Sequence, residues 1–262
     1  MENLTEIIRN NLRVKSKTTI DALIHAILCV ACGLRSCHLI DVTYVSADTS
    51  RRLLSVLRQH PTGEHLLLLQ FKDRYTFLCN KLRLEQHVKS TIESPQQWIY
   101  YDVRGKGSPP SKTRCPEVLL LWLHHRLTPF LESTQIYYYQ ETVPSYMVAL
   151  TGWALEYPVI YQTHDPDEAT LDLELDEWEV RPNCLGSIRL NVVRVWLRFH
   201  INSADYLIAS FSYPDDPAQV DLAALQEKFQ QRLIEAKKKS KHFEKASIQL
   251  TTEQVTMDTV AL

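Results

Sequence analysis

Helix-like and strand-like segments take turns along the first 160 residues, and this order leaves few architectures open. Residues 19–32 carry apolar side chains at three- and four-residue spacing, which predicts an amphipathic helix that Gly33 can end. Residues 65–71 form an apolar run that is typical of a strand buried on both faces, as in a parallel sheet. The alternation predicts an α/β fold with a mixed, largely parallel sheet covered by helices on both faces.

The same periodicities predict the remaining elements. We expect helices over 3–13, 48–58, 79–89, 116–131, 145–155 and 217–239, and strands over 37–42, 98–103, 135–139 and 158–163. Two long strands, over 187–201 and 205–213, predict a late antiparallel hairpin. Residues 1–240 then form a single α/β domain, and the polar residues 241–262 form a disordered tail.

Composition excludes several common classes of protein. The chain has 262 residues with 6 Gly, and neither G-x-G-x-x-G nor G-x-x-x-x-G-K-[ST] occurs in it. Their absence argues against the usual dinucleotide-binding fold and against P-loop NTPases. The 29 Lys and Arg nearly balance the 31 Asp and Glu, so the net charge of −2 does not favour nucleic acid as a partner.

The expected compartment follows from the N-terminus and the cysteines. The first residues show no apolar segment behind a basic start, so we expect neither a secretory signal nor a transit peptide. The longest apolar runs fall far short of the ~20 residues that a membrane-spanning helix needs. Six scattered cysteines, mostly within apolar stretches, indicate free buried thiols in a reducing compartment. We therefore expect a soluble protein of the cytoplasm or the nucleus, without a membrane segment.

Two predicted strands end alike, because Asp41 and Asp102 each follow apolar or aromatic residues and precede a Val. Ligands of open α/β sheets lie outside the carboxyl ends of the strands, so neighbouring strands would bring both carboxylates to one crevice, which Asp73 could join. Asp41 and Asp102 are the candidate catalytic residues, and Asp41, Asp73 and Asp102 are the candidate metal ligands. In the alternative interpretation, each carboxylate caps the amides of a turn or of the next helix.

A basic loop follows the strand that ends at Asp102. It contains Arg104 and Lys106 next to glycine and proline residues. Glycine lets backbone amides approach an anion and the cationic side chains supply charge, so Arg104 and Lys106 are candidate ligands for a phosphate or carboxylate. A flexible, solvated connector is the alternative.

Other reactive side chains have simpler structural interpretations. Cys29 and Cys32 have redox spacing but lie at the end of an apolar helix, which favours buried packing. Cys115 precedes a predicted helix start, and the two histidines of that helix are too far along it to serve as a base, which favours a structural thiol; His164 is the alternative base. The adjacent His124 and His125 diverge by about 100° on a helix and cannot both face one metal ion.

The strand predicted over 187–201 has two unlike faces. Odd-numbered positions from Val193 onward are apolar, whereas the other face carries Arg194, Trp196, Arg198 and His200. Before Val193, the apolar residues occupy even-numbered positions instead. This change of alternation predicts a β-bulge near Val192–Val193. The polar face can stack on bases or bind an acidic peptide, or it is a solvated sheet face on which Arg stems cover Trp.

Charge is segregated late in the chain. Acidic residues crowd the segment 165–179, and lysines crowd the segment 237–245. The two segments attract each other, or each is solvated. An adaptor that presents the acidic segment to a basic partner is a third interpretation.

Three stretches of the chain carry a family resemblance. They are Ala31–Leu34 leading to Leu39–Asp41, Tyr157–Tyr161 and Asn183–Gly186. They resemble an uncharacterised animal protein family named after an open reading frame on human chromosome 1 and classed as a domain of unknown function. The resemblance covers about residues 15–215. It implies a soluble protein with no assigned reaction or cofactor, so no site residue is carried over from it.

Because the sequence contains no catalytic signature, the leading hypothesis is a protein that binds another protein or a small ligand. The alternative is a metal-assisted hydrolase or phosphoryl-handling enzyme. In that enzyme, Asp41 and Asp102 would hold a cation while Arg104 and Lys106 meet phosphate oxygens. The sequence indicates no particular cofactor and leaves open whether the protein is an enzyme.

Overall fold

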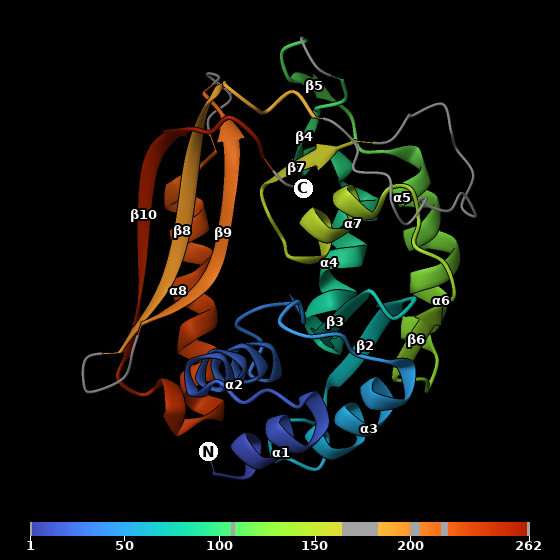
Figure 1. The fold of residues 1–262 in the computed structure, drawn as a ribbon, viewed down its shortest axis with the longest axis vertical. Coiled ribbons are helices and arrows are strands. Elements are labelled where there is room, and N and C mark those ends of the chain that lie inside the picture. Colours follow the sequence, from blue (N-terminus) through green and yellow to red (C-terminus); the bar gives the residue numbers. More distant parts are fainter. Residues whose placement is uncertain (1, 106–107, 164–182, 200–204, 216–219, 261–262) are drawn as a thin grey trace.

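The computed structural model describes residues 2–105, 108–163, 183–199, 205–215 and 220–260 (Figure 1). Its α-helices are α1 (Glu2–Leu12), α2 (Lys17–Ala31), α3 (Ala47–Leu57), α4 (Lys81–Glu93), α5 (Glu117–Trp122), α6 (Thr128–Glu132), α7 (Met147–Ala154) and α8 (Leu222–Lys239). Short helical turns lie at η1 (Pro95–Gln97), η2 (Leu123–Leu127) and η3 (Lys241–Phe243). The helix expected over 116–131 is therefore divided, because η2 has π-helical geometry between α5 and α6.

The described strands form three separate sheets. They are β1 (Cys37–Leu39), β2 (Leu66–Phe71), β3 (Tyr75–Asn80), β4 (Ile99–Asp102), β5 (Ser111–Thr113), β6 (Tyr137–Gln140), β7 (Val159–Gln162), β8 (Arg189–Phe199), β9 (Tyr206–Pro214) and β10 (Ala246–Thr256). The strand orders are β1-β3-β2-β6, β5-β4-β7 and β10-β8-β9. Helices combined with mixed sheets confirm the predicted α/β class.

Local sequence signals explain where the second helix begins and ends. The Ser16 hydroxyl accepts a hydrogen bond from the Thr19 amide at 3.3 Å, so Ser16 caps the start of α2. Gly33 adopts a φ of +79° just after the helix, where its amide donates to the Val30 carbonyl at 3.0 Å. This left-handed position favours glycine and confirms the predicted helix end.

The central strand β2 is buried along its whole length, as its sequence predicts. Leu66 and Leu68 pack into one hydrophobic cluster together with residues of α1, α2 and α3. Leu67, Leu69 and Phe71 pack into a second cluster with residues of α5 and α7. Because successive side chains of a strand point to opposite faces, β2 separates two cores.

The expectation of a largely parallel sheet is wrong. Only β2–β6 and β4–β7 pair in parallel among the described strands, whereas β1–β3, β2–β3 and β4–β5 are antiparallel. Strand β3 has no counterpart among the predicted strands, and the helix expected from residue 79 begins only at Lys81, after this strand. The turn from β2 to β3 carries no glycine, since Lys72 itself takes a φ of 50° there.

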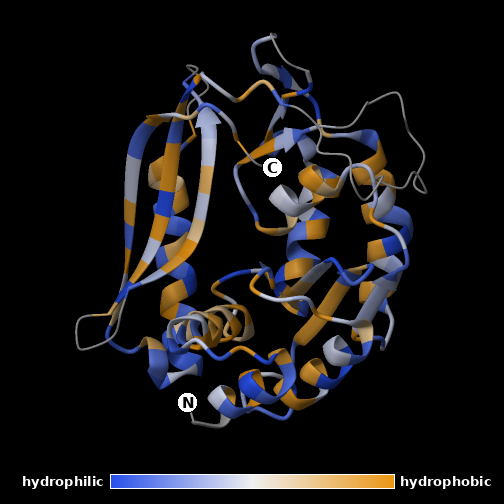
Figure 2. Ribbon diagram, in the orientation of Figure 1, coloured by the Kyte–Doolittle hydropathy of each residue, from blue (hydrophilic) through white to orange (hydrophobic). Residues whose placement is uncertain are grey.

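The three-stranded C-terminal sheet stands apart from the other two sheets, with α8 against it (Figure 1). Strands β8 and β9 pair antiparallel as predicted. Their register shifts between Val195 and Trp196, so the bulge expected near Val192–Val193 lies further along the strand. Hydrophobic and hydrophilic residues alternate along β8 (Figure 2), and the buried Val193, Val195 and Leu197 share a core cluster with α8.

The disordered tail expected over 241–262 is not what the structure shows. Residues 246–256 form β10, which pairs antiparallel with β8 along its whole length, from Ala246 opposite Phe199 to Thr256 opposite Arg189. Ala246 and Ile248 are buried in the core cluster beneath this sheet. Burial of alternate side chains and a full ladder of hydrogen bonds therefore order a segment whose composition is mostly polar.

Candidate functional site

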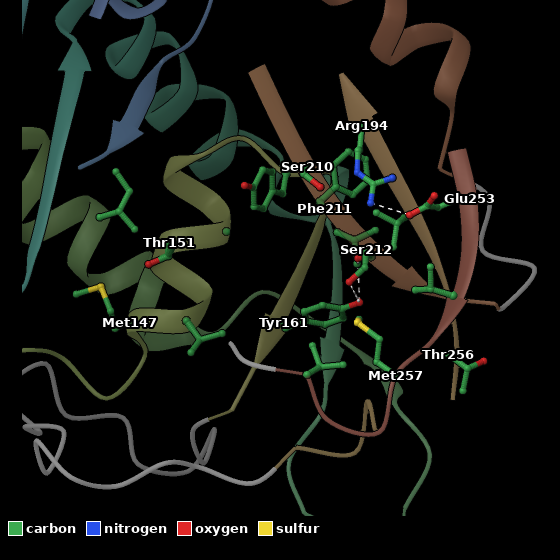
Figure 3. Close-up of a pocket in the computed structure, with 18 of the residues that line it drawn as sticks. Met147, Thr151, Tyr161, Arg194, Ser210, Phe211, Ser212, Glu253, Thr256 and Met257 are labelled. Atoms are coloured by element: carbon green, nitrogen blue, oxygen red, sulfur yellow. Dashed lines mark hydrogen bonds and ion pairs between the residues drawn. The ribbon is translucent and has the colours of Figure 1, made fainter. Parts of the chain in front are cut away.

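A cavity of about 790 Å³ separates the C-terminal sheet from α7 and β7. One wall consists of residues of β8, β9 and β10, and the opposite wall consists of residues of α7, β7 and the segment that joins them (Figure 3). Leu39 of β1 and Tyr75 of β3 also contribute to its lining. Segments more than 200 residues apart in the sequence therefore build one site.

The wall on the side of α7 and β7 is mostly apolar, but Thr151 of α7 adds a buried hydroxyl that has no hydrogen-bond partner among the described residues. Met147, Val148 and Gly152 of α7 line it together with Val159 of β7. Tyr161 adds a phenol whose hydroxyl donates to the Ser212 carbonyl at 2.9 Å and lies 3.2 Å from the Ser212 hydroxyl. Burial raises the pKa of Tyr161 to about 12, so this phenol is a hydrogen-bond donor rather than a base at neutral pH.

The wall formed by the C-terminal sheet carries the charged groups of the cavity and several hydroxyls. Ser210 lies directly opposite Arg194 in the β8–β9 ladder, and Ser212 lies opposite Val192. The Nη2 atom of Arg194 contacts Oε1 of Glu253 on β10 at 2.6 Å, as Figure 3 shows. This ion pair raises the pKa of Arg194 and lowers the pKa of Glu253. The charged groups thus lie on one side of the cavity, and the opposite side is mostly apolar apart from the hydroxyls of Thr151 and of the tyrosines.

The structure places Asp102 and Arg104 together. The Arg104 Nε lies 3.0 Å and 3.1 Å from the two carboxylate oxygens of Asp102, and Nη2 lies 2.8 Å from Oδ2. The amide of Arg104 also donates to Oδ1 of Asp102 at 3.0 Å. The Asp102 carboxylate therefore binds groups of its own turn, which favours turn capping over a role as a metal ligand. Lys106 lies outside the described residues.

The other two candidate carboxylates lie in different surroundings. Asp41 is exposed after β1, a strand of the sheet that does not contain β4. Asp73 accepts hydrogen bonds from the Tyr44 hydroxyl at 2.7 Å and from the Ala47 amide, at the start of α3, at 3.0 Å. Within the described ranges, no group of three or more His, Cys, Asp or Glu side chains could hold a metal ion.

A second, smaller cavity of about 580 Å³ lies between α4 and α8. Its charged side chains form a network around the buried Glu156, whose carboxylate forms ion pairs with Arg232 and Lys228. Burial favours a raised pKa for Glu156, but the two cations outweigh it and hold the pKa well below its usual range. Because charged side chains occupied with one another make up much of this lining, whereas the first cavity is larger and mostly apolar, the first cavity is the better candidate for a ligand site.

All six cysteines are free and buried, which confirms the predicted thiols. Burial raises the pKa of Cys29 to about 12 and the pKa of both Cys32 and Cys115 to about 11. Such thiols are weak nucleophiles at neutral pH, in agreement with the structural interpretation of the C-x-x-C spacing and of Cys115.

Sequence reasoning singled out Arg194 for its place on the polar face of β8, but not as part of a cavity. Tyr157, Val159 and Tyr161 line the cavity and belong to a stretch that carried the family resemblance. No pattern in the sequence pointed to Glu253, because the polar composition of residues 241–262 predicts a disordered tail and not a strand. The acidic segment 165–179 lies outside the described residues.

Comparisons with known proteins give a family but no activity. A family model described as a domain of unknown function, DUF4504, matches residues 3–262. No curated protein and no solved structure matches the chain. Among the described residues, no helix combines the length and the apolar character that crossing a membrane requires. The chain belongs to the DUF4504 family, a domain of unknown function.

Proposed function

We propose that this protein binds a small, largely apolar molecule in the cavity between the C-terminal sheet and α7. The observation that carries the proposal is the cavity itself, with its volume of about 790 Å³. Sites for drug-sized ligands span about 300–1,000 Å³, are mostly apolar, and contain a few polar groups that fix the ligand's orientation. Here the charged groups and two serine hydroxyls lie on the sheet wall, opposite a mostly apolar wall of α7 that carries the hydroxyl of Thr151.

The elements around the cavity also support a preformed site. Helix α7 packs against β7, with Gly152 beside Ile160, and the hydroxyl of Tyr161 ties β7 to Ser212 of β9. Strands β8 and β10 hold Arg194 and Glu253 in register. A site built on paired strands and a packed helix keeps its shape without a ligand, which reduces the ordering cost of binding.

The test is to fill the cavity. Ser210 is half-buried on β9, so Ser210→Trp adds an indole to the sheet wall in a residue type that strands accept well. Nile red, a neutral dye that brightens in apolar surroundings, serves as the probe. We expect the wild-type protein to bind the dye and Ser210→Trp to weaken binding by at least about tenfold.

Ser247→Trp is the matched control. Ser247 lies opposite Arg198 on β10, half-buried like Ser210 but away from the cavity lining, and its replacement leaves dye binding unchanged. If Ser210→Trp fails to fold, Val148→Phe obstructs the cavity from α7 instead. The proposal is wrong if the wild-type protein does not bind the dye, or if Ser210→Trp and Ser247→Trp bind it equally.

The metal-assisted alternative has weaker support. Arg104 holds the carboxylate of Asp102, and Tyr44 and Ala47 hold that of Asp73. Both pairings favour turn and helix capping over metal binding.

The six buried free thiols support our proposal that the protein resides in the reducing cytoplasm or nucleus. We also propose the narrower assignment to the family named after an open reading frame on human chromosome 1.

A further inference from the structure

We infer that the cavity selects uncharged ligands whose hydroxyl or carbonyl group lies against the C-terminal sheet, and that the Arg194–Glu253 pair sets this preference. The inference rests on the proposed function. Among the described residues that line the cavity, the charged side chains are Arg194 and Glu253, one of each sign. Their charges cancel within the site.

The pair is fixed by the geometry of the sheet. Glu253 lies opposite Val192 in the β8–β10 ladder, two positions from Arg194, so the two side chains meet diagonally on one face. Their closest N–O distance is 2.6 Å, and their side chains are 33% and 48% exposed. The pair therefore stands where the cavity meets solvent.

This arrangement disfavours either sign of ligand charge. A carboxylate that approaches the guanidinium of Arg194 also approaches the like charge of Glu253, and an ammonium group that approaches Glu253 meets Arg194. A hydroxyl or carbonyl group avoids both penalties. It can accept from a guanidinium N–H, because an Arg side chain carries five donors and Glu253 is the partner of Arg194 among the described residues.

Neighbouring groups define how such a ligand lies. The hydroxyl of Ser210 is next to Arg194 across the ladder, and the hydroxyls of Ser212 and Tyr161 lie 3.2 Å apart (Figure 3). The serine hydroxyls lie on the sheet wall and the Tyr161 hydroxyl reaches that of Ser212 from β7, whereas Met147, Val148 and the hydroxyl of Thr151 face them from α7. The ligand's main polar edge therefore lies on the sheet and its apolar body on the helix, where Thr151 offers one further hydroxyl.

The test compares three ligands that share a ten-carbon chain and differ in charge. Decanol, decanoate and decylammonium each compete with Nile red, at concentrations below those at which they form micelles. We expect decanol to displace the dye from the wild-type protein at the lowest concentration. We expect decanoate and decylammonium to bind about fivefold more weakly than decanol, because repulsion from a half-exposed charge changes an affinity by about this factor.

Removing one charge shifts the preference in a predictable direction. Glu253→Gln leaves Arg194 uncompensated and strengthens decanoate binding by about fivefold, whereas Arg194→Gln strengthens decylammonium binding by a similar factor. The double variant restores the preference for decanol. These shifts shrink in 0.5 M salt, because the Debye length falls to a few ångströms.

Arg198→Gln is the control. Arg198 lies on the same face of β8, four residues further along, and pairs with Gln249 and Asp205 outside the cavity. Its replacement leaves the order of the three ligands unchanged. The inference is overturned if the wild-type protein binds all three equally, or if Glu253→Gln and Arg194→Gln leave their order unchanged. Dye binding that Ser210→Trp still blocks would then leave the proposed function standing.

Discussion

Glu156 and Arg232 form a two-pronged ion pair that joins the connection after α7 to the middle of α8. The Arg232 Nη1 and Nη2 atoms lie 2.6 Å and 2.8 Å from the two carboxylate oxygens. Lys228 adds a contact of 2.9 Å, and the Ser36 amide donates at 3.2 Å. The Glu156 side chain is 7% exposed, so its charge is compensated by these partners rather than by water.

We predict that Glu156→Gln lowers the free energy of unfolding by about 3 kcal/mol, because removing one partner leaves buried cations uncompensated. Urea unfolding measures the change. Glu93→Gln is the control, since Glu93 is 63% exposed and lies 3.9 Å from Lys89. Its loss changes stability by less than about 0.5 kcal/mol. Equal effects of the two substitutions would show that the Glu156 network does not hold α8 in place.

Acid should destabilise the protein through its buried histidines. The ring of His87 stacks on Trp153 at 4.5 Å, and its Nε2 donates to the Trp153 carbonyl at 2.7 Å. Burial lowers the pKa of His87 from 6.5 to about 4, although the nearby Glu156 opposes this shift. The folded state thus binds this proton less readily than the unfolded chain does.

The contribution of His87 to stability is fully present above pH 6.5 and is lost as the pH falls towards 4. We predict that the free energy of unfolding declines across this window, with up to about 3 kcal/mol from His87. The His87→Gln variant keeps a donor for the Trp153 carbonyl, but glutamine does not titrate. We therefore expect its free energy of unfolding to decline less steeply with falling pH. The exposed His124→Gln is the control. An unchanged slope in His87→Gln would contradict the assignment.

Periodicity located the helices of this fold better than it located the pairing of strands. The helix expected over 19–32 is observed as Lys17–Ala31, because its apolar spacing and its glycine stop are local signals. Strand direction depends on contacts between distant segments. The short turn at Lys72 reverses the chain without a glycine, so β3 and the antiparallel pairing of β2 had no local signal.

The candidate site was harder to predict than the fold, for a related reason. The carboxylates at strand ends were chosen on the assumption of adjacent parallel strands, and β1 and β4 belong to different sheets. The cavity combines α7, β7 and the C-terminal sheet, which no spacing in the sequence brings together. The alternation along β8 did mark the polar face on which Arg194 lies. Its partner Glu253 stands in a largely exposed part of β10, where polar composition resembles that of a tail.

The last strand should be essential for the cavity. Strand β10 covers β8 along eleven residue pairs and brings Glu253, Val255 and Thr256 to the lining. We predict that a chain ending at Lys245 exposes an edge strand, aggregates and no longer binds Nile red. Light scattering and dye titration measure both effects, and a chain that lacks only residues 261 and 262 is the control. If the shortened chain stays monomeric and binds the dye like the full chain, β10 is a dispensable tail.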